Sequence, residues 1–231
     1  MESASQITLF APRSLARTSF ADIHAISRPA RTFTGDFWTT HRRGDRLWFA
    51  LGDVAGKGLP AALVMAMIQE ELEHRIGSCA ATVCDPATTL TRLHAFLRPL
   101  LPSNRFATVV IGHLRDDGTL TIANGGHCPP LLLRANGMIE EIRPTGPVAG
   151  ILPSPVWTST KTRMNSGDAL VLYSDGVSEA LASDGEELGV CGIRTALRGI
   201  ARDATARGIA SHVLSAIAST EDDVTLLAIK R

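Results

Sequence analysis

Short apolar and alternating stretches recur along the chain, and turn residues separate them. Residues 21–27 alternate apolar and polar side chains, which is the period of a strand with one buried face. Residues 47–51 are uniformly apolar, which is typical of a strand buried on both faces. A second strand is expected to begin within 34–38. The same patterns predict further strands at 107–114, 119–123, 131–134, 139–142, 156–164, 169–173 and 224–229.

Most of these predicted strands are joined by tight turns. Gly44-Asp45, Asp117-Gly118 and Asn136-Gly137 are typical hairpin turns, so the sheets are expected to be mainly antiparallel. Helices are expected in two pairs, with Pro60 and Pro86 at helix starts and Asp85 as an N-cap. They cover about 60–76, 86–100, 189–200 and 204–219. Because the strands are not each followed by a helix, a doubly wound βαβ fold is excluded.

The pattern therefore predicts an α+β fold in which helices lie outside one or two antiparallel sheets. We expect a lead-in over residues 1–19, flexible or a short helix, followed by one domain over residues 20–231. The 231 residues, 45% of them apolar, suffice for a sizeable core.

The charge balance limits the classes of partner. Lys and Arg number 23, as do Asp and Glu, so nucleic acid and anionic membrane are not expected as main partners. No apolar run approaches about 18 residues, and the N-terminus has no secretory pattern. The four cysteines at 79, 84, 128 and 191 contain no CxxC pair. We therefore expect a cytoplasmic protein with reduced thiols, without zinc or disulfides.

Aspartates stand at the boundaries of several predicted strands, beside glycine or turn residues. They are Asp36, Asp53, Asp175 and Asp222. One interpretation is that each is only a cap or turn residue, as aspartate often is. The other is that they converge, in which case they would repel one another unless a cation neutralised them. Oxygen ligands without His or Cys favour hard ions such as Mg²⁺ or Mn²⁺.

Six short motifs occur in an order that resembles a known family. They are Gly35-Asp36-Phe37-Trp38, Gly52-Asp53-Val54-Ala55-Gly56-Lys57-Gly58-Leu59-Pro60-Ala61-Ala62, Gly125-Gly126-His127-Cys128-Pro129-Pro130, Gly167-Asp168, Leu172-Tyr173-Ser174-Asp175-Gly176-Val177-Ser178-Glu179-Ala180 and Asp222-Asp223-Val224-Thr225-Leu226. Together they resemble the PPM-type (type 2C-like) serine/threonine phosphatases of the SpoIIE/RsbU branch, over about residues 20–230. The motifs around Asp53 and Asp175 are the specific ones, and the others add order and spacing.

This resemblance implies an α-β-β-α sandwich with two Mn²⁺ or Mg²⁺ ions at one edge. By motif match, Asp53 would bridge the two ions, and the Val54 carbonyl would be a further ligand. Asp175 and Asp222 would hold the second ion, and Asp36 the first, directly or through water. Asp223 is a weaker candidate. Many relatives carry a second acidic residue where this chain has Thr39.

The resemblance also implies hydrolysis of phosphoserine or phosphothreonine on a protein by a metal-activated water. The implied substrate is a phosphorylated anti-sigma-factor antagonist of the STAS type, in a partner-switching pathway. The alternative is a pseudophosphatase that binds a phosphoprotein without turnover. The sequence leaves the oligomeric state, the regulator and the choice between Mn²⁺ and Mg²⁺ open.

Other signals admit two interpretations each. Residues 56–61 match the GxGxxA pattern of dinucleotide sites, and 52–57 partly match a P-loop, but the antiparallel pattern fits neither. Lys57 either contacts phosphate or is an exposed turn residue. His127 is either a proton donor or structural. An arginine is expected on the substrate phosphate, and the candidates are Arg13, Arg17, Arg28 and Arg31.

Overall fold

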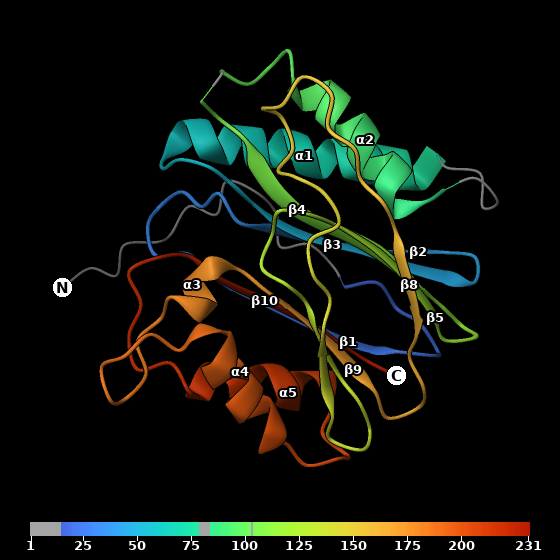
Figure 1. Cartoon of the computed structure of the whole chain (residues 1–231), viewed down its shortest axis with the longest axis vertical. Helices are drawn as coiled ribbons and strands as arrows, with labels where there is room; N and C mark the ends of the chain where they lie inside the picture. The colour runs from blue at the N-terminus through green and yellow to red at the C-terminus, as the bar shows by residue number, and fades with distance from the viewer. Residues whose placement is uncertain (1–14, 79–83, 103) are drawn as a thin grey trace.

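Two five-stranded antiparallel sheets lie face to face, and helices cover the outer face of each (Figure 1). A computed structural model describes residues 15–78, 84–102 and 104–231. One sheet has the strand order β1-β10-β9-β6-β7, and the other has the order β2-β3-β4-β5-β8. This confirms the predicted α-β-β-α sandwich of two mainly antiparallel sheets.

The elements follow the predicted order closely. The strands are β1 (Asp22–Arg28), β2 (Phe37–Arg43), β3 (Arg46–Val54), β4 (Ala107–Arg115), β5 (Thr119–Gly125), β6 (Leu131–Leu133), β7 (Ile139–Glu141), β8 (Thr160–Arg163), β9 (Ala169–Tyr173) and β10 (Val224–Lys230). The helices are α1 (Leu59–Ser78), α2 (Pro86–Leu97), α3 (Asp175–Ser178), α4 (Gly189–Arg198) and α5 (Ala206–Ser215). Asp85 caps α2 as predicted, because its side chain accepts from the backbone N–H groups of Ala87 and Thr88.

The apolar run in β3 is buried on both faces, as its composition predicted. Trp48, Ala50 and Val54 face the layer of α1 and α2. Leu47, Phe49 and Leu51 face the other sheet and form the core between the sheets. Strand β3 therefore contributes to two hydrophobic cores, one on each of its faces.

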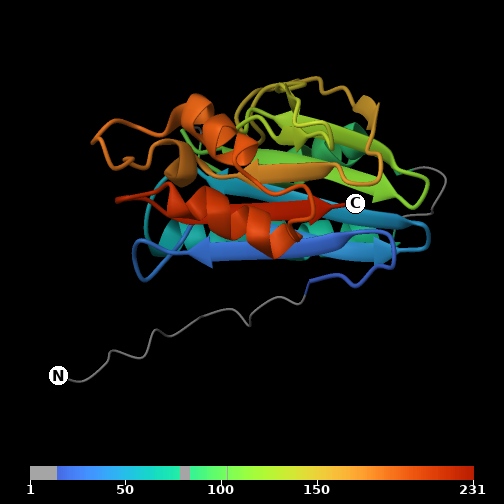
Figure 2. The ribbon, with the colours of Figure 1, turned by 90° about the horizontal axis from the view of Figure 1, so that it is seen from below.

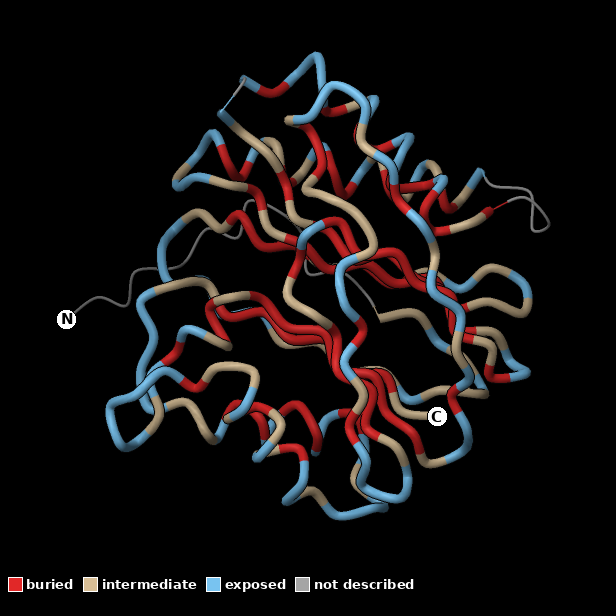
Figure 3. The backbone as a smooth tube through the Cα atoms, viewed as in Figure 1, coloured by how far each residue is buried: buried red, intermediate tan, exposed pale blue. Residues whose placement is uncertain are grey.

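The second sheet repeats this arrangement on the other side. In β9, Val171 and Tyr173 pack toward α4 and α5, and Leu170 and Leu172 pack into the core between the sheets. The view turned by 90° shows α4 and α5 lying along this sheet (Figure 2). The buried backbone is concentrated in the strands, and the loops at both ends of the sandwich are exposed (Figure 3). The ends of the strands are therefore where side chains from both sheets reach the surface.

Several predicted boundaries are wrong, among them that of helix α5, which ends at Ser215 and not near residue 219. Helix α2 ends at Leu97 and not near residue 100. Strand β8 begins at Thr160, because Trp157 leaves the strand direction and donates its Nε1–H to the Pro147 carbonyl at 2.7 Å. Strand β3 extends to Val54, so Asp53 lies inside the strand and not after it. The short α3, which begins at Asp175, was not predicted.

The lead-in and the cysteines are described in part. Residues 15–19 have no regular structure, and the Ala16 N–H donates to Thr40 Oγ1 at 2.9 Å. Cys128 and Cys191 are free, but Cys84 is disulfide-bonded, so the expectation of reduced thiols is wrong for Cys84. Spacing along a chain does not report which thiols meet in the fold. Cys79 lies outside the described residues. Among the described helices, none is long and apolar enough to cross a membrane.

Candidate metal centre

The four predicted aspartates line one pocket at an end of the sandwich. The pocket has a volume of about 130 Å³ and is lined by Asp36, Asp53, Asp175 and Asp222. It also includes Ala30, Arg31, Phe33, Gly35, Gly56, Lys57, Glu221 and Asp223. The loop before β2, the end of β3, the end of β9 and the loop before β10 therefore meet here. Of the charged lining residues, Glu221 is the one that the sequence analysis did not name as a site candidate.

Asp36 and Asp53 come together because the Gly35 backbone lies against the end of β3. The Val54 N–H donates to the Gly35 carbonyl at 3.3 Å. A side chain at Gly35 would occupy the space of the Asp53 carboxylate, so glycine permits this approach. The first two motifs are thus in direct contact.

Asp175 and Asp222 come together through a second close approach. Gly176 follows Asp175, and a Cβ atom at Gly176 would stand 2.1 Å from the Asp223 carbonyl oxygen. The Thr220 hydroxyl donates to the Gly176 carbonyl at 3.3 Å. The motif after β9 therefore packs against the loop that leads into β10.

The turn after Asp53 is held by an arginine that sequence reasoning did not find. Gly56 has φ +112°, a region that side-chain-bearing residues rarely adopt. Arg105, in the loop before β4, donates from Nη1 to the Ala55 carbonyl at 3.0 Å and lies over Gly56. This arginine covers the turn between Asp53 and the start of α1.

Asp36 is buried, with 5% of its surface exposed. Its Oδ2 atom makes no hydrogen bond to any described residue. Burial, and to a smaller extent the Asp53 charge, raise the pKa of Asp36 to about 8, although the Thr225 and Ser174 side chains act in the opposite direction. A buried carboxylate oxygen without a donor is suited to binding a cation.

The pKa values of Asp53 and Asp175 are also raised, because these carboxylates are buried close to other acidic groups. Burial, together with repulsion from Asp175 and Asp222, raises the pKa of Asp53 to about 7. The pKa of Asp175 is raised by burial and by the Asp222 charge. A bound divalent cation would offset both the cost of burying these charges and their mutual repulsion. The residues therefore fit a hard metal ion that prefers oxygen ligands.

The carboxylates share a pocket but do not form a ready ligand cluster. Within residues 15–78, 84–102 and 104–231, no three His, Cys, Asp or Glu side chains stand close enough to hold one ion. Several of the carboxylate oxygens are engaged by the backbone: Asp175 Oδ1 accepts from the Gly176 N–H and Asp222 Oδ1 from the Asp223 N–H, both at 2.9 Å. Binding an ion therefore requires small rotations of these side chains.

Two basic side chains also line the pocket. Lys57 Nζ lies 3.8 Å from Asp222 Oδ2, and its side chain is 64% exposed. Arg31 lines the pocket from the loop between β1 and β2. The Asp223 carboxylate accepts from the Ala30 N–H at 2.7 Å and thereby ties that loop to the pocket. Arg17 and Arg28 are exposed and do not line the pocket, and Arg13 lies outside the described residues.

Comparison with known proteins connects this geometry to a family. The family described as Stage II sporulation protein E (SpoIIE) matches residues 43–231. The chain belongs to the SpoIIE family. A 166-residue stretch is 30% identical to the phosphoserine phosphatase RsbU of Bacillus subtilis, covering 71% of this chain and 48% of RsbU. The chain thus spans about half the length of that relative.

Solved structures share the fold of this SpoIIE-family chain. The RsbU and RsbW domains of Rv1364c from Mycobacterium tuberculosis match with a TM-score of 0.75 and 29% identity, over 91% of this chain and 61% of that one. RsbX in complex with magnesium matches with a TM-score of 0.73 and 16% identity, over 94% and 98%. The predicted resemblance to the SpoIIE/RsbU branch is therefore confirmed.

Thr39 and His127, which belong to other parts of this SpoIIE-family chain, are buried and do not line the pocket. Thr39 is buried in β2 and does not line the pocket. His127 is buried with 4% exposure, and burial lowers its pKa to about 4. The ring is therefore neutral at pH 7, which disfavours a role as proton donor.

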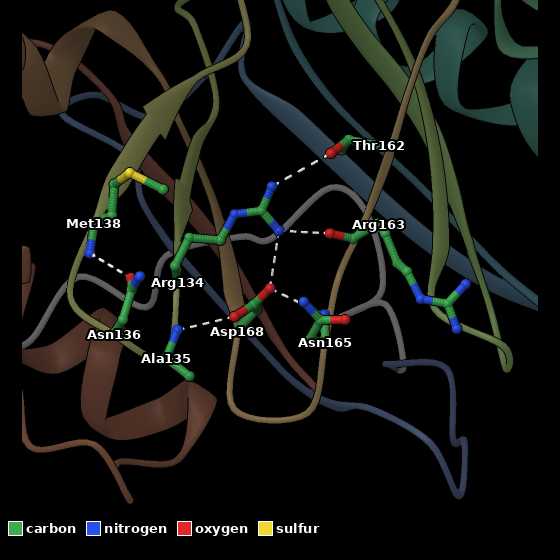
Figure 4. Close-up of a pocket in the computed structure, with 8 residues that line it drawn as sticks. All are labelled: Arg134, Ala135, Asn136, Met138, Thr162, Arg163, Asn165 and Asp168. Atoms are coloured by element: carbon green, nitrogen blue, oxygen red, sulfur yellow. Dashed lines mark hydrogen bonds and ion pairs between the residues drawn. The ribbon is translucent and has the colours of Figure 1, made fainter.

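The Gly167-Asp168 motif lies at the opposite end of β9 from Asp175, beside a second pocket (Figure 4). Asp168 accepts from Arg134 Nη1 at 2.9 Å and from the N–H groups of Ala135 and Asn165. Arg134 also binds Glu140 through both of its other nitrogens. These bonds tie the hairpin of β6 and β7 to the start of β9, so this SpoIIE-family motif is a structural junction.

Proposed function

We propose that this chain is a metal-dependent phosphatase that hydrolyses phosphoserine or phosphothreonine on a protein. The observation that carries the proposal is the convergence of Asp36, Asp53, Asp175 and Asp222 in one pocket. Membership of the SpoIIE family and similarity to the phosphoserine phosphatase RsbU support it.

Oxygen atoms from this chain would hold two ions, Mn²⁺ or Mg²⁺. Asp53 would bridge them, with Asp36 and the Val54 carbonyl on one side and Asp175 and Asp222 on the other. When bound, such a pair neutralises charge on the phosphoryl group and activates water for in-line attack. Magnesium in the similarly folded RsbX supports a divalent ion, and the proposal leaves the choice between Mn²⁺ and Mg²⁺ to experiment.

The basic residues would bind and orient the substrate. Arg31 presents a guanidinium group that suits two phosphate oxygens, and the bond from Ala30 to Asp223 holds its loop at the pocket. Lys57, which lies 3.8 Å from Asp222 and also lines the pocket, would supply a second positive charge. The residues that line the pocket carry no hydroxyl, thiol or imidazole group. This composition favours direct attack by water over a covalent intermediate on the protein.

The substrate that we propose is a phosphorylated anti-sigma-factor antagonist of the STAS type. A volume of about 130 Å³ accommodates a phosphorylated side-chain end, so the rest of a protein substrate would lie on the rim. The protein of Mycobacterium tuberculosis that shares this fold carries an RsbW domain beside its RsbU domain, which supports a partner-switching pathway. Such a pathway would place the chain in the cytoplasm.

The test is manganese-dependent release of phosphate from a STAS-type phosphoprotein, measured against the variant D53N. We expect release by the wild type with Mn²⁺ and none by D53N or after chelation. Binding of the phosphoprotein without release would instead identify a pseudophosphatase. Release at equal rates by D53N would contradict the proposed metal site.

A further inference from the structure

His127 lies on the segment that crosses from one sheet to the other. The segment 126–130 leaves β5 of one sheet and enters β6 of the other. The ring is buried, and it is not among the residues that line the pocket of aspartates. Its position between the sheets gives it contacts to both.

Toward the first sheet, the ring is hydrogen-bonded to a neighbour of Asp53. Nδ1 of His127 lies 2.8 Å from Thr108 Oγ1. Thr108 is on β4, and its Cα partner on β3 is Asp53. Because paired residues of antiparallel strands point to the same face, the Thr108 and Asp53 side chains stand side by side. The ring therefore contacts the residue that flanks the proposed bridging carboxylate.

Toward the second sheet, the ring faces the end of β9. Nε2 of His127 is buried and makes no hydrogen bond of normal geometry to a described residue. The backbone of Tyr173, two residues before Asp175, partly offsets the effect of burial on the His127 pKa, which indicates that the end of β9 lies near the ring. A neutral imidazole has one N–H and one acceptor nitrogen. The arrangement is consistent with a proton on Nε2, facing β9, while Nδ1 accepts from the Thr108 hydroxyl.

Two hydrogen bonds with the Asn124 side chain fix the backbone at His127. The Asn124 side chain accepts from the His127 N–H at 2.8 Å and donates to the His127 carbonyl at 3.1 Å. Asn124 is fully buried, and Gly126 has φ +70°, which sets the direction of the crossing segment. The His127 backbone is thus fixed where the ring meets Thr108, beside the strand that carries Asp53 to the pocket.

We infer that His127 is a positioning residue that sets the separation of the two sheets where Asp53 and Asp175 emerge. The spacing of these carboxylates fixes how well they share a pair of metal ions, and outer-shell groups of this kind tune metal affinity. The inference rests on the proposed metal site, and it adds the group that determines the fit of that site. The competing explanation is that the ring only fills space.

The experiment measures Mn²⁺ affinity by calorimetry on the full chain, together with the Mn²⁺ dependence of phosphate release. H127F keeps the ring shape and removes both nitrogens, T108V removes the hydroxyl, and T108S keeps it. H94F is the matched control, since His94 is also buried but accepts from the Gly150 N–H at 3.0 Å and packs beside Trp157. Urea unfolding of the metal-free proteins reports folding in each case.

We expect H127F and T108V to weaken Mn²⁺ binding by about 10-fold or more, and T108S to restore it to within about 3-fold of the wild type. The double variant H127F/T108V should bind Mn²⁺ about as tightly as the single variant with the lower affinity, because both substitutions break the same hydrogen bond. H94F should lose stability and keep its Mn²⁺ affinity. Should H127F fail to fold, the comparison of T108V with T108S decides.

Unchanged Mn²⁺ affinity in folded H127F and T108V would overturn the inference and leave the proposed function intact. Wild-type Mn²⁺ binding without phosphate release would overturn the proposed function, while the affinities of the variants would still decide the role of His127. Equal losses of affinity in H94F and H127F would assign both rings to general packing.

Discussion

Gly35 lies directly against the Asp53 carboxylate. A Cβ atom at residue 35 would stand 2.6 Å from Asp53 Oδ1 and 2.9 Å from the Val54 carbonyl oxygen. These two atoms are proposed ligands of the same ion, and both would be displaced by a single methyl group. The backbone at Gly35 is therefore part of the surface that shapes the site.

The substitution G35A is expected to weaken Mn²⁺ binding and phosphatase activity by about 10- to 100-fold. The Val54 carbonyl belongs to the backbone of β3 and cannot rotate away, so the strand end must shift. G77A is the control, because a Cβ at Gly77 in α1 would meet nothing within 4 Å. It should stabilise the helix by about 0.5–1 kcal/mol and leave activity unchanged. Wild-type Mn²⁺ affinity in G35A would show that Asp53 and Val54 do not act together.

Gly56 and Gly58 provide a matched pair in the turn after Asp53. Their φ values are +112° and +78°, so alanine is strained at both positions. Only at Gly56 would the new methyl group meet Arg105, with Nη1 at 1.9 Å. We expect both variants to lower the free energy of unfolding by about 1–2 kcal/mol and only G56A to lower the phosphatase rate strongly. Equal phosphatase rates in G56A and G58A would show that the Arg105 contact does not affect the proposed metal site.

The periodicity of the sequence was sufficient for most of the fold, because a residue's side of a strand follows from alternation alone. It predicted β9 at its observed bounds, and it recognised that 47–51 is buried on both faces. It failed at 156–159, where alternation continues but Trp157 turns to bind a loop carbonyl. Alternation reports burial, and it does not distinguish a strand from a buried loop.

The aspartates were recognisable because each stands beside a glycine or a turn at a strand end. The groups that act on them were not. Ser174 and Thr225 lower the pKa of Asp36 only because β9 and β10 are neighbours, and Arg105 reaches Ala55 across 50 positions. Their residue types are ordinary at their positions in the sequence. Such contacts are set by tertiary approach, which no local pattern contains.

Asp175 and Asp222 are expected to act as one unit, because they share a pocket and the Asp222 charge raises the pKa of Asp175. D175N and D222N should each lower the phosphatase rate by roughly two to four orders of magnitude, and the double variant should lose little more. The exposed Asp203, in the loop between α4 and α5, supplies the control D203N. Losses that add fully in the double variant would mean that the two carboxylates serve separate steps.

A pH dependence of stability is expected from His113, which is 5% exposed and lies outside the pocket of aspartates. Its ring packs edge-on against Trp48 at 4.8 Å between centroids, and its Nδ1 has no partner among the described residues. Burial, together with the Arg46 and Arg115 charges, lowers its pKa to about 4, although Asp85 and Asp45 act in the opposite direction.

An unfolded histidine takes up a proton near pH 6.5, whereas folded His113 does so only near pH 4. Between these values the unfolded state binds more protons, so the free energy of unfolding falls as the pH falls. His113 alone should account for up to about 3 kcal/mol of this loss. The substitution H113F removes the titrating group, so its unfolding free energy in urea, measured without metal, should fall less between pH 7 and pH 4.5. H74F, at an exposed position of α1, should keep the wild-type profile. If H113F loses as much stability as the wild type over this range, His113 titrates as it would in water, and its ring is not held neutral by the fold.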